Sequence, residues 1–504
     1  MTQSCRVSGQ ATLVACLVGL LGLAGCTTLT PQAQTAAVIA RAEAAMGSTT
    51  LKTLTVTWRG SGASVGQAHA PGMAWPGLQL TALSRSLNFE TASFREEFIR
   101  SRSEPLGGGA VPPMGTGEAR GVVLAREAYA WDVAGIATVS APAALPTRLH
   151  DLWTSTPQGA VKAAARLGAR AGVRRDFLRS WDTLTFTLPG QFGTTLVLED
   201  SGLISRIEST VANAVLGAMP VVIQFLDYQP HAGLLLPSRM LQDQGGFATL
   251  DIRVTEVAAN EAVEITIPDN VRAATETVTV EKVADGVWFL GGGTHNSVAI
   301  EQAAQIVVVE VPLHAGRARA VLDTASQLVA GKKATTVINT HHHFDHAGGL
   351  RVAAAEGATI FTSALAKPYF ETAFAQPQMQ MQSAVKAPDT VAPAARKATF
   401  MAVEAKTVLN DADRPVEIHE LQDSIHARGL LVVWLPREQL LIEADAYTPG
   451  AADAPPPAVP NANHLNLVQN LDRLGLTPRL ILPLHGRVVP AADLYAQVGR
   501  KPLP

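Results

Sequence analysis

The sequence is poor in cysteine, in aromatic residues and in runs of charge of one sign. Its three cysteines, Cys5, Cys16 and Cys26, all lie within the first 26 of 504 residues. No later position can therefore join a disulfide within the chain or offer a thiolate to a metal ion. Aromatic residues make up 5% of the chain, so its packed cores must consist mainly of alanine, valine, leucine and isoleucine.

The charge balance excludes one large class of partners. Lysine and arginine number 40 against 43 for aspartate and glutamate, a formal net charge of −3, and there is no long basic run. Nucleic-acid binding therefore lacks its usual electrostatic signature. Hydrophobic residues at 47% and charged residues at 16% supply enough apolar material for packed cores and exclude global disorder. The length predicts about three domains, or two larger ones.

A short apolar segment at the start of the chain predicts export. Arg6 is the only charged residue before an apolar run from Ala11 to Gly25. Because a bilayer span needs about 20 apolar residues, this run is typical of a signal peptide, over residues 1–25, and not of a permanent anchor. The run ends in Leu23-Ala24-Gly25-Cys26, which resembles the bacterial lipoprotein signal box.

This resemblance implies cleavage before Cys26 and acylation of that cysteine, which would attach the protein to a membrane. Thr27, not an aspartate, follows the cysteine, which resembles lipoproteins that are sent to the outer membrane. We therefore expect a location in the bacterial cell envelope, at the outer membrane and facing the periplasm. The alternative is an ordinary secretory signal with an incidental cysteine.

Residues 26–274 predict a tether followed by a β-rich accessory domain. The tether occupies residues 26–48 and includes a short helix over residues 36–46. From residue 49 onwards, runs such as Leu51–Trp58 alternate between apolar and polar residues. This alternation predicts a mainly antiparallel sheet with one buried face, which a helical segment over residues 155–178 would cover.

The end of this accessory domain, Leu226–Pro237 and the strand that begins at Ala248, has a weak resemblance of its own. It is similar to curved-sheet proteins related to the periplasmic lipoprotein carrier, which hold acyl chains against a half-open sheet. The resemblance implies contact between this domain and lipid. A generic β-sheet accessory domain explains the pattern equally well.

Residues 275–504 change to an α/β pattern. A buried strand over residues 306–310 is followed by a helix over residues 317–330 and a strand over residues 336–339. Apolar strands that alternate with helices are typical of an α/β fold. Residues 49–274 contain no cluster of histidine, aspartate or glutamate at ligand spacing, whereas ten of the thirteen histidines follow residue 290. We therefore expect the chemistry to lie in this half.

Four potential metal ligands lie within six residues directly after the strand over residues 336–339. His341 and His343 alternate, so their imidazoles can point to one ion. Asp345 and His346 lie in the following turn and can reach a second ion. Nitrogen and carboxylate donors without thiolate suit zinc, with iron and manganese as close alternatives. A chance run of surface histidines, or a single structural site, is the alternative interpretation.

This H-x-H-x-D-H pattern resembles that of the metallo-β-lactamase superfamily, and positions further along the chain match the rest of the family's ligands. The resemblance implies an αββα sandwich over residues 275–504 that binds two metal ions. The implied ligands of the first metal are His341, His343 and His426. The implied ligands of the second are Asp345, His346 and His485, with Asp445 bridging both ions.

Other polar residues near the motif have open roles. Asp345 would orient the nucleophile as well as hold the second metal, and Tyr447 would donate a hydrogen bond to an oxyanion. His342 lies between two ligands and is either a neighbour of the site or exposed. His295 and His464 are candidates to line the cleft.

We therefore predict a zinc-dependent hydrolase in which a hydroxide shared by two metals attacks an ester, thioester, amide, lactam or phosphoester. Two departures from the family bear on the substrate. Glu310 replaces an aspartate at a strand end, and the segment around His426 lacks the Pro-Gly-His-Thr sequence of thioesterase-like members. The superfamily's true lactamases often have cysteine or another residue where this chain has Asp445, which makes a lactam a weaker choice.

Two alternative functions remain at this point. One is a mononuclear iron oxygenase of the same fold. The other is a lipid-binding envelope lipoprotein with a vestigial metal site. The predicted partners are a small-molecule substrate and a membrane, reached through lipidated Cys26, and no nucleic acid.

Replacing Cys26 with serine tests the predicted anchor. Because acylation requires the cysteine thiol, we expect the Cys26→Ser protein to be unprocessed, or to be soluble and without lipid. Detergent partitioning and membrane fractionation of the variant and the wild type measure this. A variant that partitions into detergent as the wild type does would refute the lipid anchor.

Overall fold

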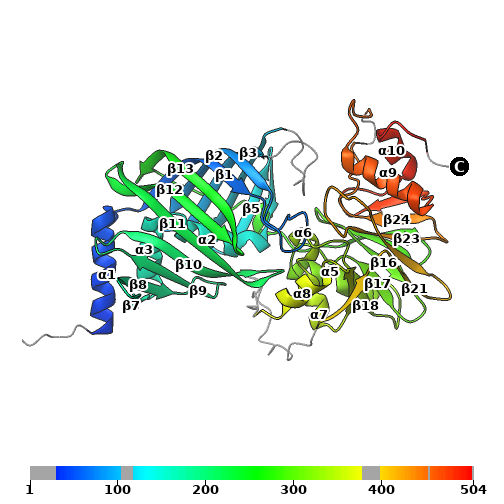
Figure 1. Cartoon of the computed structure of the whole chain (residues 1–504), viewed down its shortest axis with the longest axis horizontal. Helices are drawn as coiled ribbons and strands as arrows, with labels where there is room; N and C mark the ends of the chain where they lie inside the picture. Colours follow the sequence, from blue (N-terminus) through cyan, green and yellow to red (C-terminus); the bar gives the residue numbers. More distant parts are fainter. Residues whose placement is uncertain (1–29, 104–116, 377–397, 452–454, 502–504) are drawn as a thin grey trace, which may run out of the picture.

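The computed structural model describes residues 30–103, 117–376, 398–451 and 455–501. Within these ranges two domains lie side by side, one built on a 13-stranded sheet and the other on sheets of seven and six strands (Figure 1). The predicted signal peptide and Cys26 lie outside the described residues. In the part of the chain that is described, no helix is long and apolar enough to cross a membrane.

The helix predicted over residues 36–46 begins earlier, at Pro31. Helix α1 (Pro31–Met46) starts there because the Thr30 hydroxyl accepts a hydrogen bond from the N–H of Ala33 and a proline occupies its first position. It ends at Gly47, whose φ of 67° favours glycine. Val38, Ala42 and Met46 pack into the core of the N-terminal domain. The predicted tether is therefore helical from Pro31 onwards.

The N-terminal sheet is antiparallel at every pairing, as its alternating runs predict. Its strand order is β6-β5-β4-β3-β2-β1-β13-β12-β11-β10-β9-β8-β7, so only the β1–β13 pair joins strands that are distant in sequence. The strands are β1 (Thr53–Ala63), β2 (Gly77–Asn88), β3 (Ser93–Arg102), β4 (Ala119–Arg126), β5 (Tyr129–Ala134), β6 (Ala137–Ser140), β7 (Arg170–Arg175), β8 (Ser180–Phe186), β9 (Gly193–Leu198), β10 (Ile204–Asn213), β11 (Gly217–His231), β12 (Leu234–Gln244) and β13 (Phe247–Ala259).

Helices pack against this sheet, but the helical prediction over residues 155–178 is wrong in its second half. The 3₁₀ turn η1 (Pro142–Ala144) leads into α2 (Leu145–Thr154) and α3 (Pro157–Arg166), which bury apolar side chains in the same core as α1. Gly168, with a φ of 65°, then reverses the chain. Residues 170–175 then form β7, which pairs antiparallel with β8, so pairing within the sheet overrides the helix propensity of this segment.

The C-terminal domain has four layers, helix–sheet–sheet–helix, which confirms the predicted αββα sandwich. After the short helix α4 (Asp269–Arg272), its first sheet contains β14 (Thr279–Ala284), β15 (Val287–Gly291), β16 (Ser297–Glu301), β17 (Ile306–Val309), β18 (Ala334–Ile338), β19 (Thr359–Ser363) and β20 (Thr399–Val403). Its second sheet contains β21 (Lys406–Leu409), β22 (Val416–Glu420), β23 (Leu431–Leu435), β24 (Leu440–Glu443), β25 (Leu480–Pro483) and β26 (Val489–Pro490).

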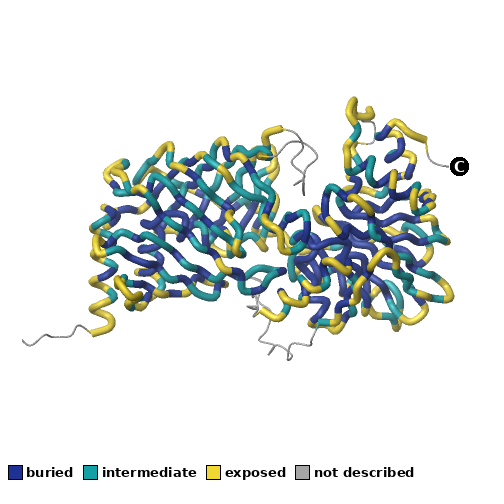
Figure 2. The backbone as a smooth tube through the Cα atoms, viewed as in Figure 1, coloured by how far each residue is buried: buried dark blue, intermediate teal, exposed yellow. Residues whose placement is uncertain are grey.

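Apolar residues fill each space between these layers. Val298, Val433 and Ile442 belong to the core between the two sheets. One outer layer consists of α5 (Ala315–Gln327), α6 (Phe344–Ala347), α7 (Leu350–Ala355) and α8 (Lys367–Phe374). The other consists of α9 (Ala462–Leu474) and α10 (Ala491–Gln497). Figure 2 shows buried backbone running through the middle of this domain, whereas buried and half-buried residues alternate along the N-terminal strands.

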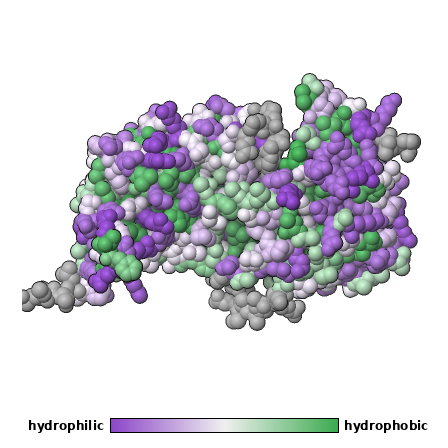
Figure 3. All heavy atoms as spheres, in the orientation of Figure 1, coloured by the Kyte–Doolittle hydropathy of each residue, from purple (hydrophilic) through white to green (hydrophobic). Residues whose placement is uncertain are grey.

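The two domains meet at loop 64–76, the connection between β1 and β2, which lies against α6 (Figure 1). The Trp75 ring, in this loop, packs edge-on against the Phe344 ring with centroids 5.5 Å apart. Figure 3 shows hydrophilic residues gathered over much of the C-terminal domain, and residues of intermediate hydropathy where the domains meet.

The Arg317 side chain links α5 by hydrogen bonds to the segment before β14 and to the end of β15. Its side chain is fully buried and donates to the carbonyl oxygens of Thr277 (2.6 Å) and Gly291 (2.8 Å), while it also pairs with Glu276 at 3.3 Å. Buried carbonyls need such partners, because leaving them unpaired costs free energy.

We expect Arg317→Ala to lower the free energy of unfolding by on the order of 3 kcal/mol, since it leaves buried carbonyls without a donor. Arg319→Ala, an exposed position on the same helix, is the control and should change it by about 0.5 kcal/mol or less. Denaturant unfolding followed by circular dichroism measures both. Equal effects of the two substitutions would contradict the bracing role of Arg317.

Candidate metal centre

The predicted ligands come from five separate segments that all follow strands or lie between them. The loop after β18 carries His341 and His343, and helix α6 carries Asp345 and His346. His426 lies between β22 and β23, Asp445 lies after β24, and His485 lies after β25. The structure brings all of these side chains together at one end of the sandwich.

Two glycines let α6 approach the loop that follows β17. A Cβ at Gly348 would lie 2.0 Å from the Leu313 carbonyl oxygen, and one at Gly349 would lie 2.2 Å from that of Val311. Both distances are far below van der Waals contact, so only glycine fits. The sequence Ala347-Gly348-Gly349 directly after the H-x-H-x-D-H pattern therefore has a steric role in placing α6.

The first cluster consists of His341, His343, His426 and Asp445. His426 Nε2 lies 3.0 Å from His343 Nδ1 and 3.3 Å from His341 Nε2. Asp445 Oδ2 lies 3.3 Å from the Nε2 atoms of both His341 and His426. Burial lowers the pKa of His341 and of His343 well below the ordinary value, so both rings are neutral at pH 7 and have a lone pair to offer.

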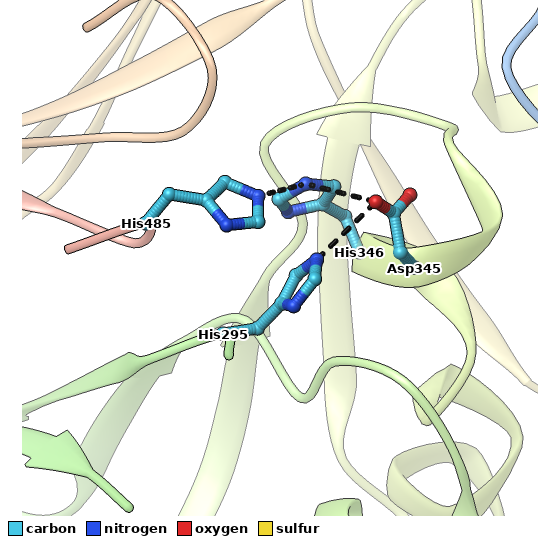
Figure 4. Close-up of side chains that lie close together, drawn as sticks. All are labelled: His295, Asp345, His346 and His485. Atoms are coloured by element: carbon cyan, nitrogen blue, oxygen red, sulfur yellow. Dashed lines mark hydrogen bonds and ion pairs between the residues drawn. The ribbon is translucent and has the colours of Figure 1, made fainter. Parts of the chain in front are cut away.

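The second cluster contains one residue beyond the predicted ligands (Figure 4). His346 Nε2 lies 3.1 Å from His485 Nε2 and 3.8 Å from Asp345 Oδ2. His295, from the turn between β15 and β16, places its Nε2 3.2 Å from the same Asp345 oxygen. The sequence places His295 as a candidate for the cleft but not among the ligands, because it lies far from the H-x-H-x-D-H pattern and the family resemblance assigns it no role.

Asp445 faces both clusters. Its Oδ2 lies 2.7 Å from His346 Nε2 and its Oδ1 lies 3.2 Å from His485 Nε2, in addition to its contacts in the first cluster. Its φ of 61° lies in the left-handed region, a conformation that needs support in a residue other than glycine. Glu443 supplies that support, because its carboxyl accepts hydrogen bonds from the N–H groups of Ala446 (3.1 Å) and Tyr447 (3.0 Å).

The Glu310 carboxylate is hydrogen-bonded to His346 and, through Thr340, linked to His341. Its Oε2 accepts a hydrogen bond from His346 Nδ1 at 2.7 Å, and its Oε1 accepts one from the Thr340 hydroxyl. That hydroxyl lies 2.9 Å from His341 Nδ1. Outer partners of this kind fix which ring nitrogen carries the proton and leave the other nitrogen free for a metal. Glu310 therefore orients His346 directly and His341 through Thr340.

The arrangement fits metal ions. The Thr294 carbonyl lies 3.3 Å from His485 Nδ1 and can only accept, which leaves a lone pair on His485 Nε2. The bond to Glu310 places a proton on His346 Nδ1, so His346 Nε2, which lies 3.1 Å from His485 Nε2, is the atom that would be offered to a metal. Among the described residues, no lysine or arginine pairs with Glu310, Asp345 or Asp445. Buried charge of this kind is normally paired or bound to a metal.

The Asp345 and Asp445 carboxylates remain ionised at neutral pH. Burial alone would raise the pKa of Asp445, but His346 and His426 outweigh it and hold that pKa well below its ordinary value. Asp345 behaves in the same way, with His346 and the hydrogen bond from His295 lowering its pKa. His346 shows the reverse, because Glu310 and Asp445 overcome the effect of burial and raise its pKa.

Three other residues that the sequence singles out, His342, Tyr447 and His464, are all buried. His342 is buried, and its Nε2 lies 2.8 Å from the Ala68 carbonyl oxygen, so of its two predicted alternatives the ring is a neighbour of the site and is not exposed. Tyr447 is 1% exposed in the apolar core beneath α9, and burial raises its pKa to about 12. Its ring packs against His464, and its hydroxyl has no hydrogen-bond partner among the described residues. The proposed oxyanion contact of Tyr447 stays a prediction.

Residues 290–485 match the family model of the metallo-beta-lactamase superfamily. That part of the chain is a domain of this superfamily, as the ligand pattern predicts. A comparison with curated protein sequences gave no match.

Solved structures with similarity to the chain have low TM-scores. Rubredoxin oxygen:oxidoreductase from Desulfovibrio gigas has 18% identity and a TM-score of 0.34, with 44% of this chain and 61% of that chain covered. A metallo-beta-lactamase from Pontibacter korlensis has 14% identity and a TM-score of 0.33, with 44% and 98% covered. A metallo-beta-lactamase from Hirschia baltica has 17% identity and a TM-score of 0.34, with 45% and 100% covered.

Substituting Asp445 tests the predicted ligand assignment. Because Asp445 is the carboxylate between the clusters, Asp445→Ala should reduce the metal content from two ions per chain towards one. His342 lies between the two ligands His341 and His343 but is not a predicted ligand. His342→Ala should therefore keep two ions, and it serves as the control for which histidines of this run bind metal. Elemental analysis of the purified variants counts the metals. Two ions retained in Asp445→Ala, with one lost in His342→Ala, would show that the assignment is wrong.

Proposed function

We propose that the protein is a hydrolase that uses two zinc ions. The observation that carries this proposal is the position of Asp445, whose two oxygens face nitrogen ligands of both clusters. Two nearby dications repel strongly in a partly dry site, and a shared anionic ligand reduces that repulsion. The donors are nitrogen and oxygen only, and these suit zinc, with iron and manganese as alternatives.

The first ion would be held by His341, His343 and His426, and the second by Asp345, His346 and His485, with Asp445 shared. Zinc ions bound in this way supply a Lewis acid and lower the pKa of a bound water towards ~7. His295 adds a nitrogen to the second cluster. It is placed to hold that ion or to hydrogen-bond a substrate.

Asp345 is the carboxylate best placed to orient an attacking water. It stays ionised, and it is anchored at both oxygens, by His295 at Oδ2 and by the Gln67 amide (2.9 Å) at Oδ1. A carboxylate held in this way can accept a hydrogen bond from water and fix its direction towards a substrate carbonyl or phosphoryl group. Glu310 and Thr340 keep the histidines in the required tautomers and so reduce reorganisation during the reaction.

The proposed substrate is a small molecule with an ester, thioester, amide, lactam or phosphoester bond. A cavity of about 640 Å³ lies between the domains, with apolar residues from both in its wall, including Pro71, Met219 and Leu365. Tyr369 also contributes to this wall, and its ring centroid lies 6.2 Å from that of His342. The cavity favours a substrate with an apolar portion. Anchoring through Cys26 would place the reaction at the cell envelope.

Metal analysis combined with a substrate panel tests the function. We expect two zinc ions per chain, and hydrolysis of at least one among matched ester, thioester, lactam and phosphodiester substrates with short and long acyl groups. Removal of the metal by a chelator should abolish turnover, and zinc should restore it. One iron per chain with oxygen consumption would favour the oxygenase, and a protein without metal would favour the lipid-binding alternative.

A further inference from the structure

Loop 64–76 belongs to the N-terminal domain, yet consecutive residues in it bond to the metal centre of the C-terminal domain. The Gly66 carbonyl accepts a hydrogen bond from the N–H of Phe344 (3.2 Å), directly before Asp345. The His69 carbonyl accepts one from the N–H of Arg428 (2.8 Å), two residues after His426. The loop is therefore bonded to the segments that carry ligands of both clusters.

Ala68 acts on a ligand of the first cluster. Its carbonyl oxygen lies 2.9 Å from His343 Nε2. Because a carbonyl can only accept, the His343 proton must be on Nε2, and the lone pair is on Nδ1. Nδ1 is the atom that lies 3.0 Å from His426 Nε2 inside the cluster. Ala68 is 1% exposed, so water does not compete for this bond.

Gln67 acts on a ligand of the second cluster. Its side-chain amide donates to Asp345 Oδ1 at 2.9 Å, while His295 lies at 3.2 Å from Oδ2. These two contacts fix the rotation of the carboxylate. One ligand from each cluster is thus oriented by neighbouring residues of a domain that contributes no predicted ligand itself.

The loop is held in this position from both sides. On the N-terminal side, the Trp75 indole donates to the Gln244 carbonyl at 3.2 Å, and its ring packs against Phe344 of the other domain. On the C-terminal side, Gly66 contacts Phe344 so closely that a Cβ there would lie 2.5 Å from the ring. Its φ of 84° also favours glycine.

We propose that loop 64–76 is a working part of the metal centre, in which Ala68 and Gln67 are positioning residues that orient His343 and Asp345. Metal affinity then depends on the N-terminal domain although every predicted ligand lies in the C-terminal one. This inference rests on the metal binding proposed above, but it does not depend on which bond is hydrolysed.

Paired glycine substitutions in the full-length chain test the loop. Gly66→Ala should displace the loop from Phe344 and lower zinc affinity by about tenfold or more, the usual effect of losing an outer partner of a ligand. Gly72→Ala is the matched control, because Gly72 is in the same loop and also has a positive φ (77°), but a Cβ there meets nothing within 4 Å. Competition with a chromophoric chelator measures zinc affinity without any substrate.

Gln67→Met removes the amide donor while keeping the length of the side chain, and it decides the question if Gly66→Ala does not fold. It should weaken zinc binding and change the visible spectrum of the cobalt-substituted protein, because Asp345 would be free to rotate. Gln79→Met, at an exposed position on β2, should leave both unchanged. Wild-type affinity and spectrum in Gln67→Met and in a folded Gly66→Ala would overturn the inference. A wild-type protein that binds no metal would instead refute the proposed function.

Discussion

The central constraint in this structure is buried and half-buried negative charge without a lysine or arginine to balance it. Glu310, Asp345 and Asp445 converge on His346, and among the described residues only histidines form ion pairs with them. Such a cluster is costly in a protein interior unless cations occupy it. Much of the surrounding architecture serves to assemble it, from the glycines that let α6 approach to the strained backbone at Asp445.

Residues from both domains form hydrogen bonds with the ligands of this cluster. Glu310 orients histidines of both clusters from the end of β17, and Glu443 holds the turn that presents Asp445. Loop 64–76 of the N-terminal domain contributes hydrogen bonds to Asp345 and His343. An arrangement in which the coordinating atoms of most ligands are fixed before a metal binds is preorganised. This feature links the fold to the proposed chemistry.

The sequence predicts most of what lies within a few residues of a strong local signal. The strand over residues 306–310, the alternating N-terminal runs and the ligand positions follow from short patterns, and the structure places all of these ligands in one region. The strand β7 was missed because its pairing with β8 outweighs local propensity. Loop 64–76 gives no signal in the sequence, because a backbone carbonyl such as that of Ala68 can belong to any residue type. His295 is identified only as a candidate for the cleft, because it reaches the second cluster from the distant β15–β16 turn.

X-ray absorption at the metal edge of the purified protein is the most direct test of an Asp445 shared between two ions. We expect nitrogen and oxygen scatterers only, from histidine and carboxylate, together with a metal–metal distance of about 3.5–4 Å, the spacing of two-metal hydrolytic sites. Sulfur in the first shell would contradict it, because no cysteine lies beyond residue 26. A fully loaded protein without a metal–metal vector would contradict it as well, because Asp445 would then not be shared between two ions.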